Sequence, residues 1–307
     1  MSISLQNINN LIDQDVQRFI LECDVQYYKS LQTVVDTIIS VQPQKPIILL
    51  SGPSGASKTT TALMIEGILD NLSITTHSLS LDNYFISFTK EQVELALNGK
   101  IDLESPCRLD ITFLNDQLIK MINGESVALP KYDFKKDQRI LTNRILTRKP
   151  NDIVIIEGTH ALNPDVISIP REKVFKIYVD VQQSVIFDNC TLRPPIIRLV
   201  RRMIRDKRYR NRSVQKTFEM FTKVEIGEKK YIQPYKKYAN CILDTFIPYE
   251  LSVYKKFLES DFDLLDNTLH LHNTVKILNQ LHPISIDKIH PKSIVREFTG
   301  DSGFSYQ

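Results

Sequence analysis

Residues 46–60 combine an apolar run, a turn of small residues and a Lys-Thr-Thr sequence, in the order PIILLSGPSGASKTT. This order predicts a short buried strand that leads through a tight loop into a helix. Small residues allow successive backbone N–H groups to curl around an anion, and the helix points the positive end of its dipole at the same place. We therefore expect a phosphate-binding loop made of Gly52, Ser54, Gly55, Ala56, Ser57, Lys58, Thr59 and Thr60.

The loop fits the pattern G-x-x-x-x-G-K-[ST] except at Ser57, which stands where the pattern has a glycine. We expect Lys58 to reach the outer phosphates of a nucleotide and Thr59 to hold a magnesium ion. The alternative is a serine-rich turn that binds nothing. The apolar run before the loop and the Lys-Thr-Thr sequence argue against that alternative.

Composition limits the class of protein. The chain has 307 residues, of which 42% are hydrophobic, enough for one large α/β domain with additions or for two smaller domains. Its net charge of +3 is too small to indicate nucleic-acid binding. Its four cysteines are far apart, no secretory leader opens the sequence, and no apolar run approaches the roughly 18 residues of a membrane span. We expect a cytoplasmic protein with reduced thiols and no membrane partner.

Five apolar segments are predicted to be strands, and most segments between them are predicted to be helical. The strands are residues 47–50, 74–81, 152–158, 174–181 and 240–246, and the helices are 58–71, 91–98, 109–123, 198–212, 249–265 and 271–281. Residues 1–45 are predicted to form one or two helices that end at Pro43 and Pro46. Residues 129–139 are expected to be a polar and aromatic loop.

Two carboxylates follow or end predicted strands. Asp82 comes directly after residues 74–81, and Glu157 ends the apolar run of residues 152–158. Ligands of parallel sheets gather at the carboxyl ends of the strands, so both side chains are candidates for the site beside the loop. Glu157 would orient magnesium or its water shell. Asp82 is either a site residue or the cap of a turn, and spacing alone leaves both interpretations open.

The segment of residues 198–212 is strongly basic. It contains Arg198, Arg201, Arg202, Arg205, Arg208 and Arg212, which recur every three or four residues and would share one face of a helix. Such a face is most often simply solvated. Because Asp206 is the single acid among these cations, we expect anions to compensate the charge, and phosphates are the favoured anions. Nucleic acid is a less favoured partner, since there is little aromatic interleaving beyond Tyr209.

Seven further stretches occur in an order typical of one family. They are SLDNYF (80–85), LPKYDF (129–134), IIEGTHALNP (155–164), RLVRRMIRDKRYR (198–210), GEKKYIQPY (227–235), PYELSVYK (248–255) and SIVREFTGDS (293–302). From about Lys45 onward the chain resembles the uridine kinase and phosphoribulokinase group of phosphate-loop kinases. It is most similar to bacterial uridine kinase family proteins that often carry a threonyl-tRNA synthetase-like N-terminal domain, in whose place this sequence has only a helical arm.

The resemblance implies an α/β fold, with five parallel strands flanked by helices and an arginine-bearing lid that closes over ATP. It divides the chain into an N-terminal arm (1–45), a kinase core (46–250) with its lid around 198–215, and a C-terminal helical extension and tail (251–307). In such kinases the aspartate matched by Asp82 is the general base. Phosphate-contacting arginines match Arg202, Arg205, Arg210 and Arg212, and residues expected at the acceptor match Tyr84 and Tyr132.

The departures from the family concern the acceptor. Glu104 stands where uridine kinases have a ribose-binding aspartate, and Asp137 stands where they have a histidine that contacts the pyrimidine. An Asp137 carboxylate prefers donor groups on the acceptor, so another nucleoside or a polyol is favoured over uridine. The glycine usual before Arg212 is replaced by Asn211.

These observations favour an ATP- and Mg²⁺-dependent kinase that phosphorylates a hydroxyl of a nucleoside-like small molecule. In this hypothesis the catalytic residues are Asp82, Lys58, Arg205 and Arg210. Two hypotheses from other classes stay open: a catalytically weak nucleotide-binding regulator, and an RNA-binding or RNA-modifying protein that uses the basic segment. Association into a homo-oligomer is compatible with each of them.

Overall fold

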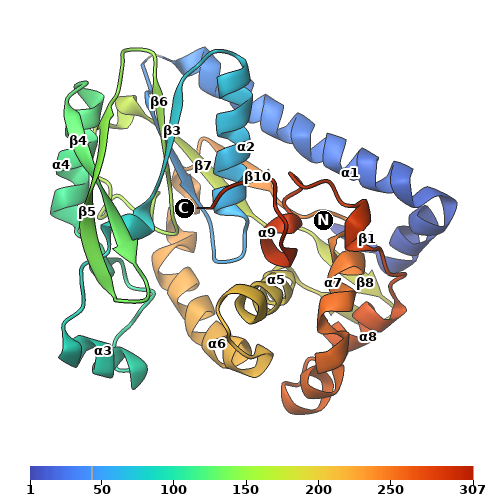
Figure 1. Ribbon diagram of the computed structural model, residues 1–307. Coiled ribbons are helices and arrows are strands. Elements are labelled where there is room, and N and C mark those ends of the chain that lie inside the picture. The colour runs from blue at the N-terminus through green and yellow to red at the C-terminus, as the bar shows by residue number, and fades with distance from the viewer. Residues whose placement is uncertain (43, 307) are drawn as a thin grey trace.

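The centre of the protein is a parallel sheet of five strands in the order β10-β7-β2-β6-β3 (Figure 1). The computed structural model describes residues 1–42 and 44–306, so Pro43 lies outside the described residues. The strands are β2 (Ile47–Ser51), β3 (Thr76–Ser80), β6 (Ile153–Glu157), β7 (Val174–Asp180) and β10 (Cys241–Asp244). All five lie within or beside the segments predicted from the sequence, and the predicted α/β fold is confirmed.

Helices cover both faces of this sheet (Figure 1). The α-helices of the described residues are α1 (Leu5–Val41), α2 (Lys58–Asn71), α3 (Lys90–Leu97), α4 (Ile111–Ile122), α5 (Pro194–Tyr209), α6 (Val214–Tyr231), α7 (Glu250–Leu258), α8 (His272–Gln280) and α9 (Arg296–Thr299). The central strand shows why two layers form, because its side chains alternate between two apolar cores. Ile48 and Leu50 belong to the core that contains α1, α2 and α5, whereas Ile47 and Leu49 belong to the core beneath α4.

The N-terminal arm is one long helix with a break. Asp15 has non-helical backbone angles, and its side chain accepts hydrogen bonds from the N–H groups of Gln17 and Arg18. Asp15 thus caps the second part of α1 in the manner of a helix N-cap. Buried α1 residues such as Leu31 and Ile38 join the same apolar core as Leu50 of β2.

The expectation of a loop at residues 129–139 is wrong. The structure has an antiparallel hairpin there, formed by β4 (Ser126–Asp133) and β5 (Gln138–Thr147). Two features hide the hairpin in the sequence. Pro130 interrupts β4 at a shift of register, and most of β5 is exposed, so no alternation of apolar and polar residues marks it. At the turn Asp137 has a left-handed backbone, with φ of 50°.

A second, small sheet was not predicted. Its strands are β1 (Ser2–Ser4), β8 (Ser184–Phe187) and β9 (Cys190–Leu192), and β1 runs parallel to β8. Strands of three or four residues are too short to show a period in the sequence. The segment predicted as one helix over 249–265 is α7 followed by a short 3₁₀ turn (Glu259–Asp261) and a π-helical turn (Leu264–Thr268).

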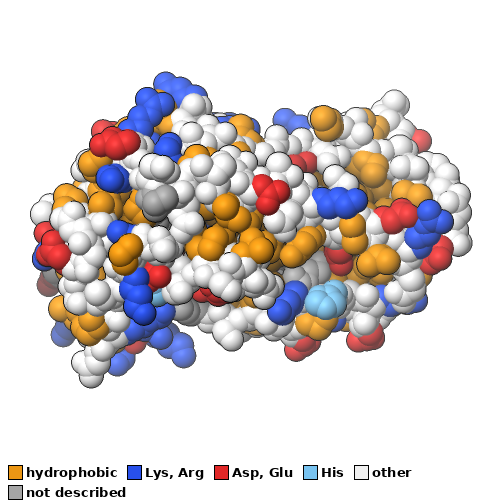
Figure 2. Space-filling view, turned by 90° about the horizontal axis from the view of Figure 1, so that it is seen from above, with side chains coloured by type: hydrophobic (Ala, Val, Ile, Leu, Met, Phe, Trp, Pro, Cys, Tyr) orange, Lys and Arg blue, Asp and Glu red, His pale blue; other side chains and the backbone are white. Residues whose placement is uncertain are grey.

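The upper surface carries an apolar hollow. Figure 2 shows hydrophobic side chains gathered in the middle of this face. A cavity of about 780 Å³ lies between α1, α2 and the C-terminal segment, and Leu21, Met64 and Phe304 are among its lining residues. Within the described residues, no helix combines the length and hydropathy that crossing a membrane requires.

Candidate active site

The loop between β2 and α2 has the geometry of an anion cradle. Gly52 cannot carry a side chain, because a Cβ atom there would lie 2.1 Å from the carbonyl oxygen of Val179. Helix α2 begins at Lys58, and neither a side-chain cap nor an acidic residue in its first turn satisfies the first N–H groups. These N–H groups, together with the helix dipole, are free to bind an anion.

Ser57 adopts the left-handed backbone that the glycine of this pattern supplies. Its φ is 57° and its ψ is 37°. A residue with a Cβ atom is strained in this region, and the cost is about 1–3 kcal/mol. The Ser57 hydroxyl is 3.5 Å from Nη1 of Arg201, which is too long for a strong hydrogen bond.

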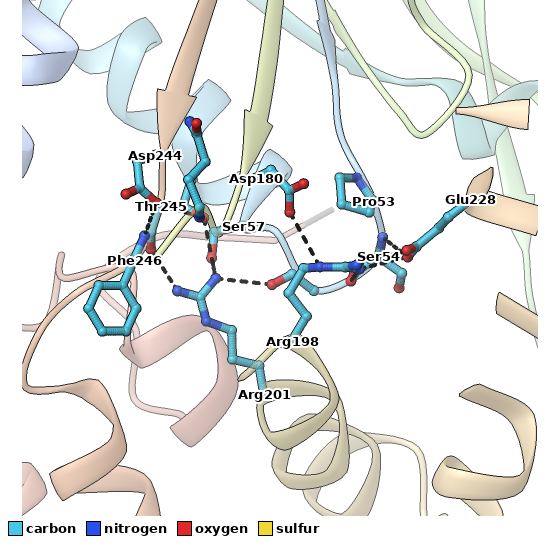
Figure 3. A network of polar contacts seen from close by, with 12 residues as sticks. Pro53, Ser54, Ser57, Asp180, Arg198, Arg201, Glu228, Asp244, Thr245 and Phe246 are labelled. Carbon is cyan, nitrogen blue, oxygen red and sulfur yellow. Dashed lines mark hydrogen bonds and ion pairs between the residues drawn. The ribbon is translucent and has the colours of Figure 1, made fainter. Parts of the chain in front are cut away.

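Two arginines of α5 fasten the loop from below (Figure 3). Arg198 donates from Nη1 to the carbonyl oxygen of Ser54 at 2.9 Å, and both of its Nη atoms bind Glu228 at 2.7 and 2.8 Å. Arg201, whose side chain is fully buried, donates to the carbonyl oxygen of Gly55 at 3.0 Å and pairs with Glu250 at 2.7 and 2.9 Å.

These pairings correct one expectation from the sequence. Phosphates were the favoured counter-anions of the basic segment, but the charges of Arg198 and Arg201 are neutralised by the carboxylates of Glu228 and Glu250. Both acids come from later helices, α6 and α7. The two arginines therefore hold the loop in shape, and the remaining arginines of the segment are the ones that can meet a ligand.

Three of those arginines gather around a single carboxylate, that of Asp206. Arg205 donates to it at 2.9 and 3.0 Å, Arg212 at 3.1 Å, and Arg210 lies 3.3 Å from it. Burial alone would raise the pKa of Asp206, but the neighbouring arginines outweigh burial and lower it. Asp206 is thus a fixed anion that orients three cations. Asn211, with φ of 47°, provides the left-handed bend that brings Arg210 and Arg212 to the same carboxylate.

Lys58, Asp82 and Glu157 meet above three adjacent strands. They follow or end β2, β3 and β6, which are neighbours in the sheet. Burial raises the pKa of Asp82, and burial raises the pKa of Glu157 to about 7, while the charge of Lys58 acts in the opposite direction on both. Burial lowers the pKa of Lys58, opposed first by the charge of Glu157 and then by that of Asp82.

The turn after β3 bears on the role of Asp82. The Ser80 hydroxyl accepts the N–H of Asp82 at 3.3 Å and so caps the 3₁₀ turn Leu81–Tyr84. The capping interpretation of Asp82 is therefore not supported, because Ser80 is the capping residue. The charges of Arg205 and Arg210 also lower the pKa of the Asp82 carboxyl, so both arginines lie near it.

Aromatic side chains pack together and form a wall near Asp82. The Tyr132 ring packs edge-on against Phe85 and Phe134, with centroids 5.6 and 5.1 Å apart. Arg108 donates to the Tyr132 hydroxyl at 3.2 Å, and its charge acts on both Tyr132 and Asp82. Asp137 at the hairpin turn also acts on Tyr132. Arg108 was missed, since a single arginine between a cysteine and a leucine carries no signal in the sequence.

Glu104 lies in the loop before α4, close to Arg202. It packs against Gly227, where a Cβ atom would lie 2.4 Å from the Cβ of Glu104. Burial raises the pKa of Glu104, and the charge of Arg202 opposes this. Arg202 itself reaches the loop, where its Nη1 donates to the Ser54 hydroxyl.

Tyr84 does not join the other residues expected at the acceptor. Its side chain is buried in the core, and its hydroxyl donates to Oε1 of Gln117 at 2.9 Å. His160, which packs against Tyr231, is buried as well, and burial lowers its pKa to about 4, so its ring is neutral at neutral pH.

The strand order, the loop after the central strand and the helix that follows it define a phosphate-loop fold of the kinase type. Residues 47–250 match the profile of the Phosphoribulokinase / Uridine kinase family. The chain belongs to this family and is therefore a phosphotransferase by membership. The match leaves residues 1–46 and 251–307 outside.

Individual relatives agree with this assignment. The chain is 30% identical to a uridine kinase of Halalkalibacterium halodurans over 205 residues, which are 65% of this chain and 86% of the relative. It is 28% identical over the same length to a uridine kinase of Streptococcus equi subsp. zooepidemicus, covering 65% of this chain and 88% of that protein. A candidate fructose transport system kinase from Silicibacter sp. TM1040 shares the fold, with a TM-score of 0.51 and 15% identity over 69% of this chain and 98% of that structure.

Proposed function

We propose that the protein is an ATP- and Mg²⁺-dependent kinase that transfers the terminal phosphoryl group to a hydroxyl of a nucleoside or polyol. The observation that carries the proposal is the meeting of Lys58, Asp82 and Glu157 above adjacent strands, with the arginines held by Asp206 acting on the same carboxyl. Phosphoryl transfer requires positioning and charge neutralisation, and these groups supply both.

The donor side of the site fits a nucleotide triphosphate and its metal. The free N–H groups at the start of α2 and the Lys58 ammonium would hold phosphate oxygens. Among the described residues no group of three or more His, Cys, Asp or Glu side chains could hold a metal by itself. Mg²⁺ commonly binds through one or two protein oxygens, with phosphates and water completing its shell, and Thr59 with Glu157 would provide those oxygens.

On the acceptor side, Asp82 would take the proton of the attacking hydroxyl. Burial raises the pKa of Asp82 and so increases its affinity for a proton, while Lys58 and the arginines favour the charged form that can accept one. The aromatic wall at Tyr132 suits a flat ring, and the carboxylates of Asp137 and Glu104 accept hydrogen bonds from hydroxyl or amino groups. The names of the relatives, uridine kinases, support a nucleoside as the acceptor class.

A panel of acceptors tests this proposal. Purified protein is incubated with ATP, Mg²⁺ and one nucleoside, pentose, hexose or polyol at a time, and ADP release is followed. We expect one class of acceptor to raise ADP release at least tenfold over the acceptor-free rate, and EDTA to abolish the increase. If ATP binds but no acceptor raises its turnover, the protein is a nucleotide-binding regulator.

The lid arginines should affect catalysis more than binding. We expect Arg205→Ala and Arg210→Ala to lower kcat about tenfold or more while ATP affinity changes by only a few-fold, because their charges act once the lid closes on the transferring group. Asp206→Asn should behave in the same way, since it leaves both arginines without their fixed anion. Steady-state kinetics and calorimetry measure the two quantities.

Asp116→Asn is the matched control for Asp206→Asn. Asp116 is an exposed acid of α4 that binds Lys120 four residues on, with 57% of its side chain accessible. Its removal should leave kcat and ATP affinity unchanged. If all four variants show equally small effects, the arginines around Asp206 take no part in catalysis.

Ser57→Gly should bind ATP at least as tightly as the wild type and turn over no more slowly. Glycine adopts the backbone at φ of 57° without strain, and it keeps the N–H group that an anion would need. Relief of about 1.4 kcal/mol of backbone strain would raise the affinity for ATP tenfold. Calorimetry and ADP release on both proteins check this result. Loss of activity would mean that the Ser57 hydroxyl contacts a phosphate or the metal shell.

A further inference from the structure

The C-terminal segment of residues 293–306 lies against the phosphate-binding loop, although it is outside the part of the chain that matches the family. Helix α9 places Glu297 beside the first turn of α2, where its Oε2 accepts a hydrogen bond from the Thr60 hydroxyl. The Tyr306 hydroxyl lies 3.1 Å from the same Thr60 oxygen. Figure 1 shows this dark red end of the chain crossing α2.

The anchor of this segment lies at the edge of the sheet that is opposite Asp82. Asp82 follows β3 at one edge of the sheet, whereas Thr245 follows β10 at the other edge. Arg201 donates to the Thr245 carbonyl at 2.6 Å, and its guanidinium lies 5.3 Å from the centre of the Phe298 ring of α9. The segment is thus fixed to the β10 side.

This placement gives the bound nucleotide a direction. If Asp82 receives the proton of the acceptor, the terminal phosphoryl group must lie on the β3 side, near Lys58. The phosphate chain then follows the N–H groups of the first turn of α2. The nucleoside part would then extend toward the β10 side, past Thr60, whose hydroxyl binds Glu297 and lies 3.1 Å from the Tyr306 hydroxyl.

The bonding of Glu297 suits a hydroxyl donor. The side chain is partly exposed, and its hydrogen-bond partner in the described part of the chain is the neutral hydroxyl of Thr60. A carboxylate has about four acceptor positions, so most of them remain for a ligand. Beyond its phosphates a nucleotide presents a ribose, whose 2′- and 3′-hydroxyls are donors, and carboxylates bind ribose hydroxyls in other nucleotide sites.

We infer that Glu297 is a specificity-determining residue of the donor site, whose carboxylate accepts a hydrogen bond from a ribose hydroxyl of ATP. The inference rests on the proposed function. It makes the C-terminal segment a part of the nucleotide site, with Tyr306 as its second polar group. A carboxylate that only repelled phosphates would lower the affinity for every phosphate ligand equally. It would not distinguish ATP from its deoxy analogues.

Affinities for four ligands test the inference. The ligands are ATP, 2′-deoxy-ATP, 3′-deoxy-ATP and inorganic tripolyphosphate, each with Mg²⁺, on the wild type, Glu297→Met and Glu297→Gln. We expect the wild type to prefer ATP to one of the deoxy analogues by about tenfold, the effect of one hydrogen bond to a charged group. The preference should vanish in Glu297→Met and persist in part in Glu297→Gln, whose amide oxygen still accepts.

Asp301→Asn is the matched control. It removes the same charge from the same segment, and 82% of the Asp301 side chain is exposed. The Asp301→Asn variant should prefer ATP to the deoxy analogue as strongly as the wild type does. An unchanged preference in both Glu297 variants, or equal gains for ATP and tripolyphosphate, would overturn the inference alone. A wild type that binds neither ATP nor tripolyphosphate would instead overturn the proposed function, and the inference with it.

Discussion

Asp82→Asn should reduce phosphoryl transfer by roughly 10²–10⁴-fold while leaving ATP affinity nearly intact, which is the usual cost of losing a general base. The substitution removes the proton acceptor but preserves the shape of the turn, because Ser80 rather than Asp82 caps it. Calorimetry with ATP and steady-state ADP release with the best acceptor measure the two effects.

The control is Asp110→Asn, another aspartate of the same region. Asp110 caps α4 through the N–H of Phe113 and binds Arg139 at 2.8 Å. Its substitution should lower stability slightly and leave the chemical step unchanged. Turnover of Asp82→Asn at the wild-type rate would show that Asp82 takes no part in proton transfer.

Arg201→Met should lower the free energy of unfolding by about 3–5 kcal/mol, the cost of breaking a buried ion pair by removing one partner. Glu250 would lose the cation that neutralises it, and the carbonyl oxygens of Gly55 and Thr245 would lose their donor. Because Gly55 belongs to the phosphate-binding loop, ATP affinity should fall as well. Urea unfolding measures the first effect and calorimetry the second.

A double-variant cycle identifies the pair as the cause. Arg201→Met with Glu250→Met should cost less than the sum of the two single changes, because no unpaired charge remains. Arg18→Met tests an exposed pair for comparison. Arg18 and Glu22 are 75% and 57% accessible, so this change should cost less than about 1 kcal/mol. Additive losses at Arg201 and Glu250 would contradict the pairing.

The sequence predicted the sheet and the loop because both rest on local patterns. A few neighbouring residues are enough to indicate each element. The apolar run before Gly52 and the one that ends at Glu157 indicate strands, and the small residues after Gly52 indicate the loop. The left-handed backbone of Ser57 could also be anticipated, since the pattern requires glycine there. The hairpin that contains Tyr132 could not, because its strands are mostly exposed and lack an apolar period.

The acidic partners of the buried arginines could not be predicted from local sequence patterns. Glu228 and Glu250 lie 30 and 49 residues from Arg198 and Arg201, and no spacing in the sequence links them. Folding, by bringing α6 and α7 against α5, decides which arginines are structural and which remain for a ligand. Glu297 is farther still from its partner, since it lies 237 positions after Thr60.

The most direct test of the account is a ³¹P NMR measurement of the complete reaction. Protein, ATP, Mg²⁺ and the best acceptor from the panel are mixed, and the spectrum is followed with time. We expect the γ-phosphate signal to fall while a phosphomonoester signal grows in equal amount, and Asp82→Asn to stop both changes. Conversion of the γ-phosphate to inorganic phosphate alone, or no change with any acceptor, would contradict transfer to a hydroxyl.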